Sequence, residues 1–434
     1  MRIYLAVTFW GEEYRRYFLD FCLASLLAPG NITAITDKTS ARLLIATNDD
    51  DWSALQTEPL FLAAAAHIPI EHVSFATRRH STAHQKMLVM SEAHRKLAGR
   101  MFEDRANGIF LYPDSIVATG FISRLEELRR NGASVVMFMN VRFANEGLID
   151  EFKRRQSMKP SGPIAVSTRE LARVTIDHMH SELKRSDFDG SFDDHGCSSF
   201  FWTVTPKQDL LFHCGCWIPL LIDYGSMQAH DDSTFEHSTL DGDYVAQNLA
   251  DSTNVHFVTD TDELFMVSFT PETTVRYSLE PAFGYGIPRL RTALKINNAH
   301  SFLYHQAPMN WLAKERFRIP VRYRGGGSAE ATWRLVERHA SRIVARMERG
   351  GNLIDRLLHA LADPLGALQR LSPLWLSRLI WVVRMSWRYR RPIARRIGQI
   401  ICGNRAARHH AAWRFRQYAH VAMGRHFYDP EPQT

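Results

Sequence analysis

The chain has 434 residues, of which 45% are hydrophobic and 23% are charged. This composition is typical of a folded soluble protein and excludes a disordered chain, and the length predicts two or three domains. Five cysteines are too few and too scattered for a disulfide framework, so we expect a reducing, cytoplasmic location.

The formal net charge of +7 is divided unevenly along the chain. Residues 331–434 contain 19 arginines, no lysine and 6 acidic residues, a net charge of +13, which leaves a net charge of −6 for residues 1–330. This asymmetry predicts a catalytic or binding body joined to a basic region that meets an anionic partner. No apolar run approaches the roughly 20 residues of a membrane-spanning helix, and the run from Ile3 to Trp10 lacks the features of a signal peptide.

Strand-like and helix-like segments alternate over the first 150 residues. The expected strands cover residues 3–9, 43–47, 70–75, 109–112 and 134–141, and the expected helices cover residues 18–27, 60–66, 85–102 and 121–130. This alternation predicts an α/β fold with a mostly parallel sheet flanked by helices. A capping box from Ser167 to Glu170 predicts a further helix.

The second half of the chain has weaker signals at first. Two strands are expected at 200–204 and 255–258 with an irregular stretch between them, and recurring prolines from Thr270 to Pro320 are typical of a connector. The sequence Gly325-Gly326-Gly327-Ser328 predicts a linker. Beyond it, an apolar face and arginines at every fourth position predict basic amphipathic helices. We therefore expect an α/β domain at 1–270, a connector at 271–328 and an Arg-rich helical region at 329–434.

Two acidic motifs are candidates for catalysis. Asp114 follows a buried apolar strand, and ligands bind at the carboxyl edge of open α/β sheets, so it is a candidate metal ligand; a turn aspartate after Pro113 is the alternative. Asp241 and Asp243 stand where a later helix begins. They are candidates for a general base, or equally for an N-cap and a first-turn acid.

Other polar residues are expected to bind substrate at the same edge. Those that follow the first two strands, adjoin Asp114 or begin a helix are Thr8, Trp10, Gly11, Thr47, Asn48, Asp49, Lys86 and Ser115. For each of them a loop role or a solvated charge is the alternative. His213 is a candidate metal or diphosphate ligand, with a structural histidine as the alternative. A zinc site at Cys197, Cys214 and Cys216 is disfavoured because Cys-x-Cys is not the usual zinc spacing.

Four short stretches resemble a group of bacterial glycosyltransferase-like proteins: Val-Thr-Phe-Trp-Gly from Val7, Ser-Leu-Leu-Ala-Pro-Gly-Asn from Ser25, Tyr-Pro-Asp-Ser from Tyr112 and Leu-Asp-Gly-Asp-Tyr from Leu240. The order of elements over residues 1–270 resembles the GT-A, Rossmann-like fold of nucleotide-sugar glycosyltransferases. The resemblance implies sugar transfer from a nucleotide-diphosphate donor to an envelope glycan or lipid-linked acceptor, with the base before the helix at Asp241 and Asp243.

One departure from the family concerns the metal. The family's Asp-x-Asp appears as Asp114-Ser115-Ile116, so only the first carboxylate is present. A Mn²⁺ or Mg²⁺ ion held by one carboxylate and the substrate phosphates would suffice for transfer. A non-catalytic, membrane-peripheral scaffold is the alternative. The Arg-rich helices are expected to rest on an anionic inner membrane surface, and the alternative is that their apolar faces pack on each other as a helical bundle. Nucleic acid is not expected because apolar residues fill the opposite helical faces.

Overall fold

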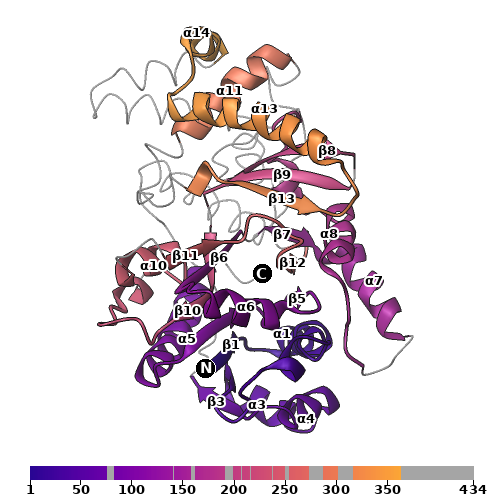
Figure 1. The fold of residues 1–434 in the computed structure, drawn as a ribbon, viewed down its shortest axis with the longest axis vertical. Coiled ribbons are helices and arrows are strands. Elements are labelled where there is room, and N and C mark those ends of the chain that lie inside the picture. Colours follow the sequence, from indigo (N-terminus) through magenta and orange to yellow (C-terminus); the bar gives the residue numbers. More distant parts are fainter. Residues whose placement is uncertain are drawn as a thin grey trace, which may run out of the picture.

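The computed structural model describes residues 1–75, 83–139, 141–157, 162–190, 199–206, 208–215, 217–236, 238–249, 254–272, 287–301 and 316–362 (Figure 1). The strands are β1 (Ile3–Thr8), β2 (Arg42–Thr47), β3 (Ile70–Ser74), β4 (Asn107–Leu111), β5 (Ser115–Val117), β6 (Val135–Met139), β7 (Arg142–Ala144), β8 (Ser199–Thr205), β9 (Asp209–Cys214), β10 (Trp217–Asp223), β11 (Val255–Phe257), β12 (Met266–Thr270) and β13 (Pro320–Arg324). The helical segments are α1 (Glu12–Tyr17), η1 (Phe18–Leu23), α2 (Ala24–Leu26), η2 (Ile32–Ala34), α3 (Asp49–Leu55), α4 (Pro59–Ala65), α5 (Ala83–Glu103), α6 (Phe121–Arg130), α7 (Asn145–Ser157), α8 (Thr168–Asp177), α9 (Ser181–Lys184), η3 (Ser233–Glu236), α10 (Gly242–Asn248), α11 (Pro288–Ser301), α13 (Glu330–Glu348) and α14 (Leu353–Ala362).

The largest sheet in the described part of the chain, here called the main sheet, has seven strands in the order β11-β6-β10-β4-β1-β2-β3. Strand β10 runs antiparallel to β4 and β6, while the other recorded pairings in this sheet are parallel. Strands β1, β4 and β6 are buried along their whole length, as expected for strands covered on both faces. Helix α5 packs against β1 to β4. The predicted α/β fold with a mostly parallel sheet flanked by helices is therefore confirmed.

Some segments predicted to be irregular are regular. The stretch between the strands near 200–204 and 255–258 contains β9 and β10, and β10 lies in the middle of the main sheet. Proline is rare in a central strand because it cannot donate to the ladder, and β10 accommodates Pro219 with a register shift before Leu221. Helix α11 also lies in the expected connector. Its apolar periodicity is interrupted because Lys295 and Asn297 are buried on its inner face.

Two smaller sheets of three strands each occur in the described ranges. The second sheet has the order β5-β12-β7, and the third sheet has the order β13-β9-β8. Helix α13 lies across the third sheet (Figure 1). Its buried residues are Trp333, Ala340, Ile343, Val344 and Met347. The apolar face of the first predicted basic helix therefore packs on protein. The part of the predicted Arg-rich helical region beyond residue 362 lies outside the described residues.

The glycine-rich stretch after β13 is a tight turn anchored to β9. The carboxylate of Asp209, which is 1% exposed, accepts hydrogen bonds from the backbone nitrogens of Gly326 at 2.9 Å and Ser328 at 3.2 Å. The turn thus holds the start of α13 close to the third sheet. The division into three domains stays a prediction. Across the described ranges, no helix is both long enough and apolar enough to span a membrane.

The segment from Ser25 to Asn31, here called the 25–31 segment, positions through hydrogen bonds the part of the chain that follows Asp114. The Ser25 hydroxyl accepts a hydrogen bond from the Val117 backbone nitrogen at 3.1 Å, and the Asn31 side-chain oxygen accepts one from the Ile122 nitrogen at 3.1 Å. These bonds fix β5 and the first turn of α6. The 25–31 segment therefore determines the position of the chain after the Asp114 turn.

Replacing Gly30 in the 25–31 segment with alanine is expected to destabilise the protein by about 3 kcal/mol or more. Gly30 has a φ of +76°, and an added Cβ would lie 2.6 Å from the Gly120 Cα. Urea unfolding measures the change. The matched control is Gly99→Ala in α5, where an added Cβ meets nothing within 4 Å and a gain of up to about 1 kcal/mol is expected. Equal stability of the two variants would contradict the close approach.

Candidate functional site

Most of the predicted polar residues lie at one edge of the main sheet. Parallel pairing brings together the carboxyl ends of β1, β2 and β4, since Thr8 stands opposite Ala46 and Val7 opposite Leu111. The loops that contain Trp10, Gly11, Asn48 and Asp114 all start from this edge. In open α/β sheets it is the edge at which ligands bind.

A buried carboxylate joins the loops that follow β1 and β2. Asp51 is 4% exposed and accepts hydrogen bonds from the Gly11 nitrogen, from the Asn48 amide and from Arg15, at 2.7, 2.7 and 2.6 Å. Asn48 also caps α3. Asp51 was not among the predicted residues because it ends a run of three aspartates, which is typical of a solvated helix start. Its position three residues after the N-cap Asn48 is the sequence feature that could have identified it.

The remaining predicted residues of these loops differ in exposure. Thr8 and Thr47 are the last residues of β1 and β2 and are buried. Asp49 is exposed and accepts a hydrogen bond from Ser74 at 2.9 Å. Trp10 packs edge to face on Phe75, with ring centroids 6.0 Å apart.

Lys86 is exposed in the first turn of α5. That helix packs on the strands whose carboxyl ends form the edge. The lysine remains a candidate for phosphate contact.

Asp114 lies in the turn between β4 and β5 and is partly buried. Its backbone carbonyl accepts a hydrogen bond from the Phe269 nitrogen at 3.0 Å, which ties the turn to β12. Burial raises the pKa of its carboxyl to about 6, against the opposing effects of a backbone hydrogen bond and of the Arg142 charge. A carboxyl with a raised pKa at a ligand-binding edge is a candidate functional group.

Arg142 and two tyrosines interact electrostatically with Asp114. Strand β12 pairs with β5 and β7 on its two sides, so that Ser268 stands opposite both Ser115 and Arg142. Burial, followed by the charge of Asp114, raises the pKa of both Tyr14 and Tyr112, and the charge of Arg142 opposes both shifts. These contacts were not predicted because Tyr112 ends an apolar strand and Arg142 belongs to a separate short strand.

Asp241 approaches the same place from another part of the chain. Its charge contributes to the raised pKa of Tyr112, after burial and Asp114. Its two oxygens accept hydrogen bonds from the Ser238 hydroxyl at 2.8 Å and from the Tyr244 nitrogen at 3.3 Å. Asp241 therefore has the N-cap role that the sequence left open. Asp243 lies in the first turn of α10, and its side chain is outside the described residues.

A buried arginine lies against the turn between these two acids. An added Cβ at Gly242 would be 2.7 Å from Nη1 of Arg316, which is 2% exposed and stacks over the Phe257 ring at 5.4 Å. The turn therefore has a cation beside it. Arg316 was not among the predicted residues because it is distant in sequence from Asp241 and lies in a segment without periodicity.

Two predicted residues have structural contacts. Ser115 is buried, and its hydroxyl donates to the Tyr112 carbonyl at 2.6 Å. His213 lies on β9 in the third sheet, where Nδ1 donates to the Phe317 carbonyl at 2.9 Å and the ring packs on Trp202. Burial lowers the pKa of His213 to about 4. These contacts are typical of a structural histidine, and His213 lies in the third sheet, outside the turn that contains Asp114. Its role as a metal or diphosphate ligand stays a prediction.

The fit of a metal ion rests on Asp114. Among the residues that the structure describes, no group of three or more His, Cys, Asp or Glu side chains is arranged to hold a metal ion. Cys197 and Cys216 of the disfavoured zinc site lie outside those residues. Asp114 offers one carboxylate, so the donor set suits a Mg²⁺ or Mn²⁺ ion that takes its other ligands from substrate phosphates and water.

No protein-family model and no curated protein matches the sequence. Matching solved structures include residues 1–349 of S. aureus TarS, with a TM-score of 0.30, 8% identity and coverage of 84% of this chain and 92% of that one. The mannosyltransferase PcManGT from Pyrobaculum calidifontis, in complex with GDP-Man and Mn²⁺, has a TM-score of 0.25, 11% identity and coverage of 84% and 80%. Mouse xyloside xylosyltransferase 1 has a TM-score of 0.22, 13% identity and coverage of 36% and 59%. The chain spans 22% of a further TarS structure. The fold and the activity of this chain are therefore argued from its own residues, because all of these TM-scores are 0.30 or lower.

Proposed function

We propose that the chain is a glycosyltransferase that moves a sugar from a nucleotide-diphosphate donor to an envelope glycan or lipid-linked acceptor. The observation that supports this most is the convergence of Asp114, Arg142 and Asp241 near the carboxyl edge of a mostly parallel sheet. A sugar diphosphate donor needs a place for its base and ribose, cations near its phosphates and a base for the acceptor hydroxyl. Each of these has a candidate at this edge.

The donor's base and ribose are assigned to the loops after β1 and β2. The contributing residues are Thr8, Trp10, Gly11, Thr47, Asn48 and Asp49. Asp51 joins the two loops through its hydrogen bonds with Gly11 and Asn48. Arg142 is half exposed and pairs with Glu182 at 3.5 Å, and its charge reaches Asp114. Its guanidinium is therefore suited to the negative charge that develops on the leaving diphosphate. Lys86 is assigned to a phosphate.

Asp114 is the residue that would hold a divalent cation. A bound Mn²⁺ or Mg²⁺ ion would supply further positive charge at the diphosphate. The general base is assigned to the Asp241 and Asp243 pair, which lies in the turn before α10. Arg316 is buried beside this turn, against Gly242, and so places a positive charge next to it.

The single carboxylate at Asp114 also favours a second candidate, a binding or scaffold protein without catalysis. Nucleotide binding and turnover separate the two. We expect a nucleoside diphosphate with Mn²⁺, at 100 times its Kd, to add about 2.7 kcal/mol to the free energy of unfolding. Thermal unfolding with UDP or GDP measures this effect, and release of nucleoside diphosphate from nucleotide sugars measures turnover. Stabilisation without release would favour the scaffold, and the absence of any shift would count against both.

A further inference from the structure

Helix α14 turns its aliphatic side chains toward solvent. Four of them, here called the aliphatic face, are between 56% and 80% exposed: Leu353, Ile354, Leu357 and Leu361. Their spacing puts them on one side of the helix. On the opposite side, Asp355 is 3% exposed and His359 is fully buried. The helix therefore has the reverse of the usual arrangement for a helix packed on a protein body.

Polar contacts fix this orientation. The Asp355 carboxylate forms an ion pair with Arg346 at 2.5 Å and accepts a hydrogen bond from the Asn352 nitrogen at 2.9 Å. The Asp355 carbonyl also accepts a bond from the Asn297 amide on α11 at 3.4 Å. Rotating α14 to bury its leucines would break this ion pair and leave the buried Asp355 carboxylate without its cation. The aliphatic face is therefore held outward by the fold itself.

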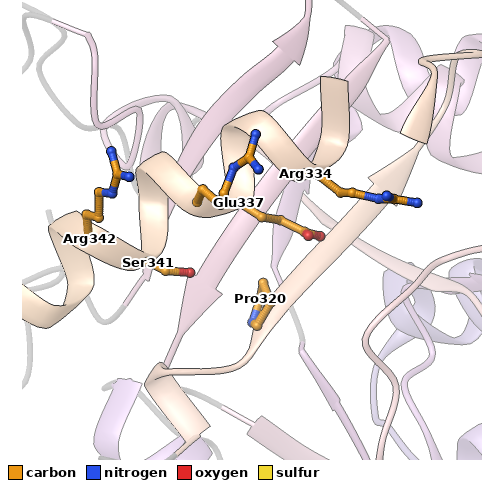
Figure 2. Close-up of a pocket in the computed structure, with 6 residues that line it drawn as sticks. Pro320, Arg334, Glu337, Ser341 and Arg342 are labelled. Carbon is orange, nitrogen blue, oxygen red and sulfur yellow. The ribbon is translucent and has the colours of Figure 1, made fainter. Parts of the chain in front are cut away.

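A row of arginines on α13 leads to α14. Arg334, Arg338 and Arg342 are exposed, four residues apart, and lie opposite the buried side of the helix. With Glu337, Ser341 and Pro320 of β13 they line a groove of about 460 Å³ (Figure 2). Glu337 pairs with Arg322 at 2.5 Å and so is already engaged. The row continues to Arg346, which binds Asp355 on α14.

We propose that the aliphatic face of α14 and the arginine row of α13 form one docking surface for an anionic phospholipid bilayer. Aliphatic side chains of an interfacial helix enter the acyl boundary, while nearby guanidinium groups meet the lipid phosphates. The charge distribution fits this partner, because residues 331–434 carry a net charge of +13 and residues 1–330 a net charge of −6. An anionic surface therefore attracts the C-terminal quarter of the sequence, to which α13 and α14 belong, more strongly than the rest of the chain.

A second copy of the chain fits this surface less well. A symmetric dimer would bring two arginine rows together, and like charges across an interface oppose association. The apolar contact is assigned to α14, which exposes four aliphatic side chains. On α13 most apolar residues are buried on the third sheet, and Leu335 is exposed. The inference does not depend on the transfer reaction, so it can fail while the proposed function stands.

Vesicle sedimentation of the full chain tests the surface. Wild-type protein is expected to bind vesicles of phosphatidylcholine with phosphatidylglycerol, less so as salt is raised, and to bind phosphatidylcholine alone weakly. The double variant Leu357→Ser with Leu361→Ser should lose about tenfold or more in affinity for the anionic vesicles. Because both leucines are exposed, its melting temperature should equal that of the wild type.

A matched control comes from the other end of the molecule. Leu62 on α4 is 55% exposed, close to the 56% of Leu357, and lies far from α14 (Figure 1). Leu62→Ser should bind vesicles like the wild type. Arg338→Gln with Arg342→Gln should weaken binding and flatten its salt dependence.

Three results would overturn the proposal. The first is wild-type affinity in the Leu357→Ser, Leu361→Ser variant, which would place the membrane contact elsewhere in the chain. The second is an equal loss in Leu62→Ser, which would make the effect non-specific. The third is self-association of the wild type that the leucine variant abolishes, without vesicle binding, because the face would then be an interface between copies.

Discussion

Replacing Asp114 with asparagine is expected to abolish sugar transfer and, at the same time, to make the ligand-free protein more stable. The loss of transfer follows from removing the one carboxylate assigned to the divalent cation. The gain in stability follows because burial raises the pKa of this carboxyl from 3.8 to about 6, so the ionised group is disfavoured in the folded state. A shift of this size corresponds to about 3 kcal/mol, which partial exposure of the side chain reduces to roughly 1–2 kcal/mol.

The stability difference should depend on pH in a defined direction. The pKa of Asp114 is higher in the folded protein than in the unfolded chain, so the unfolded chain gives up this proton first as the pH rises. The wild type therefore loses stability between about pH 4 and about pH 6 relative to the Asp114→Asn variant, and the gap is complete above that window. Unfolding at several pH values measures the gap.

Glu103→Gln replaces an exposed carboxylate at the end of α5 and serves as the control. This variant should keep wild-type sugar transfer and wild-type stability. Wild-type turnover in the Asp114→Asn variant would remove Asp114 from the mechanism. A gap that stays constant over the whole pH range would show that the carboxyl is not desolvated.

Replacing Lys295 with methionine is expected to destabilise the protein by about 3–5 kcal/mol. Lys295 is fully buried on α11, and its ammonium donates to the carbonyl oxygens of Phe188 at 3.0 Å and Gly190 at 2.9 Å, and also to that of Asp187. Methionine has a similar length but no donor, so these carbonyls would lose their buried hydrogen bonds. The ammonium attaches the loop before β8 to α11.

Denaturant unfolding compares this variant with Lys153→Met, in which the replaced lysine is exposed on α7 and the expected change is within about 0.5 kcal/mol. A loss below about 1 kcal/mol for Lys295→Met would show that the buried ammonium contributes little. The inner face of α11 would then tolerate an apolar side chain.

The parts of the fold that were predictable are those whose signal is local. Strands β1, β2, β4 and β6 are continuous apolar runs, and helix α6 begins at Phe121 and ends at Arg130 as its periodicity predicts. Strand β10 could not be predicted in the same way. Its proline argues against a central strand, and only the partner strands β4 and β6 determine its place.

The same distinction applies to the candidate site. Asp114 was found because a single strand and a proline identify its position. Asp51, Arg142 and Arg316 were missed because their importance depends on contacts with loops and strands that are distant in the sequence. Charged residues of this kind carry no periodic signal. Whether Asp114, Asp241 and Asp243 act on a substrate stays a prediction.

The central position of β10 has a consequence for how the chain folds during synthesis. Strands β1 to β4 can pair as soon as residue 111 has left the ribosome, but β6 has no neighbour in the main sheet until residues 217–223 follow. At about 5–20 residues per second this delay lasts several seconds, during which the edges of β4 and β6 are both unpaired and apolar. A nascent chain halted within this interval is therefore the form in which the protein is most exposed to aggregation and most dependent on chaperones.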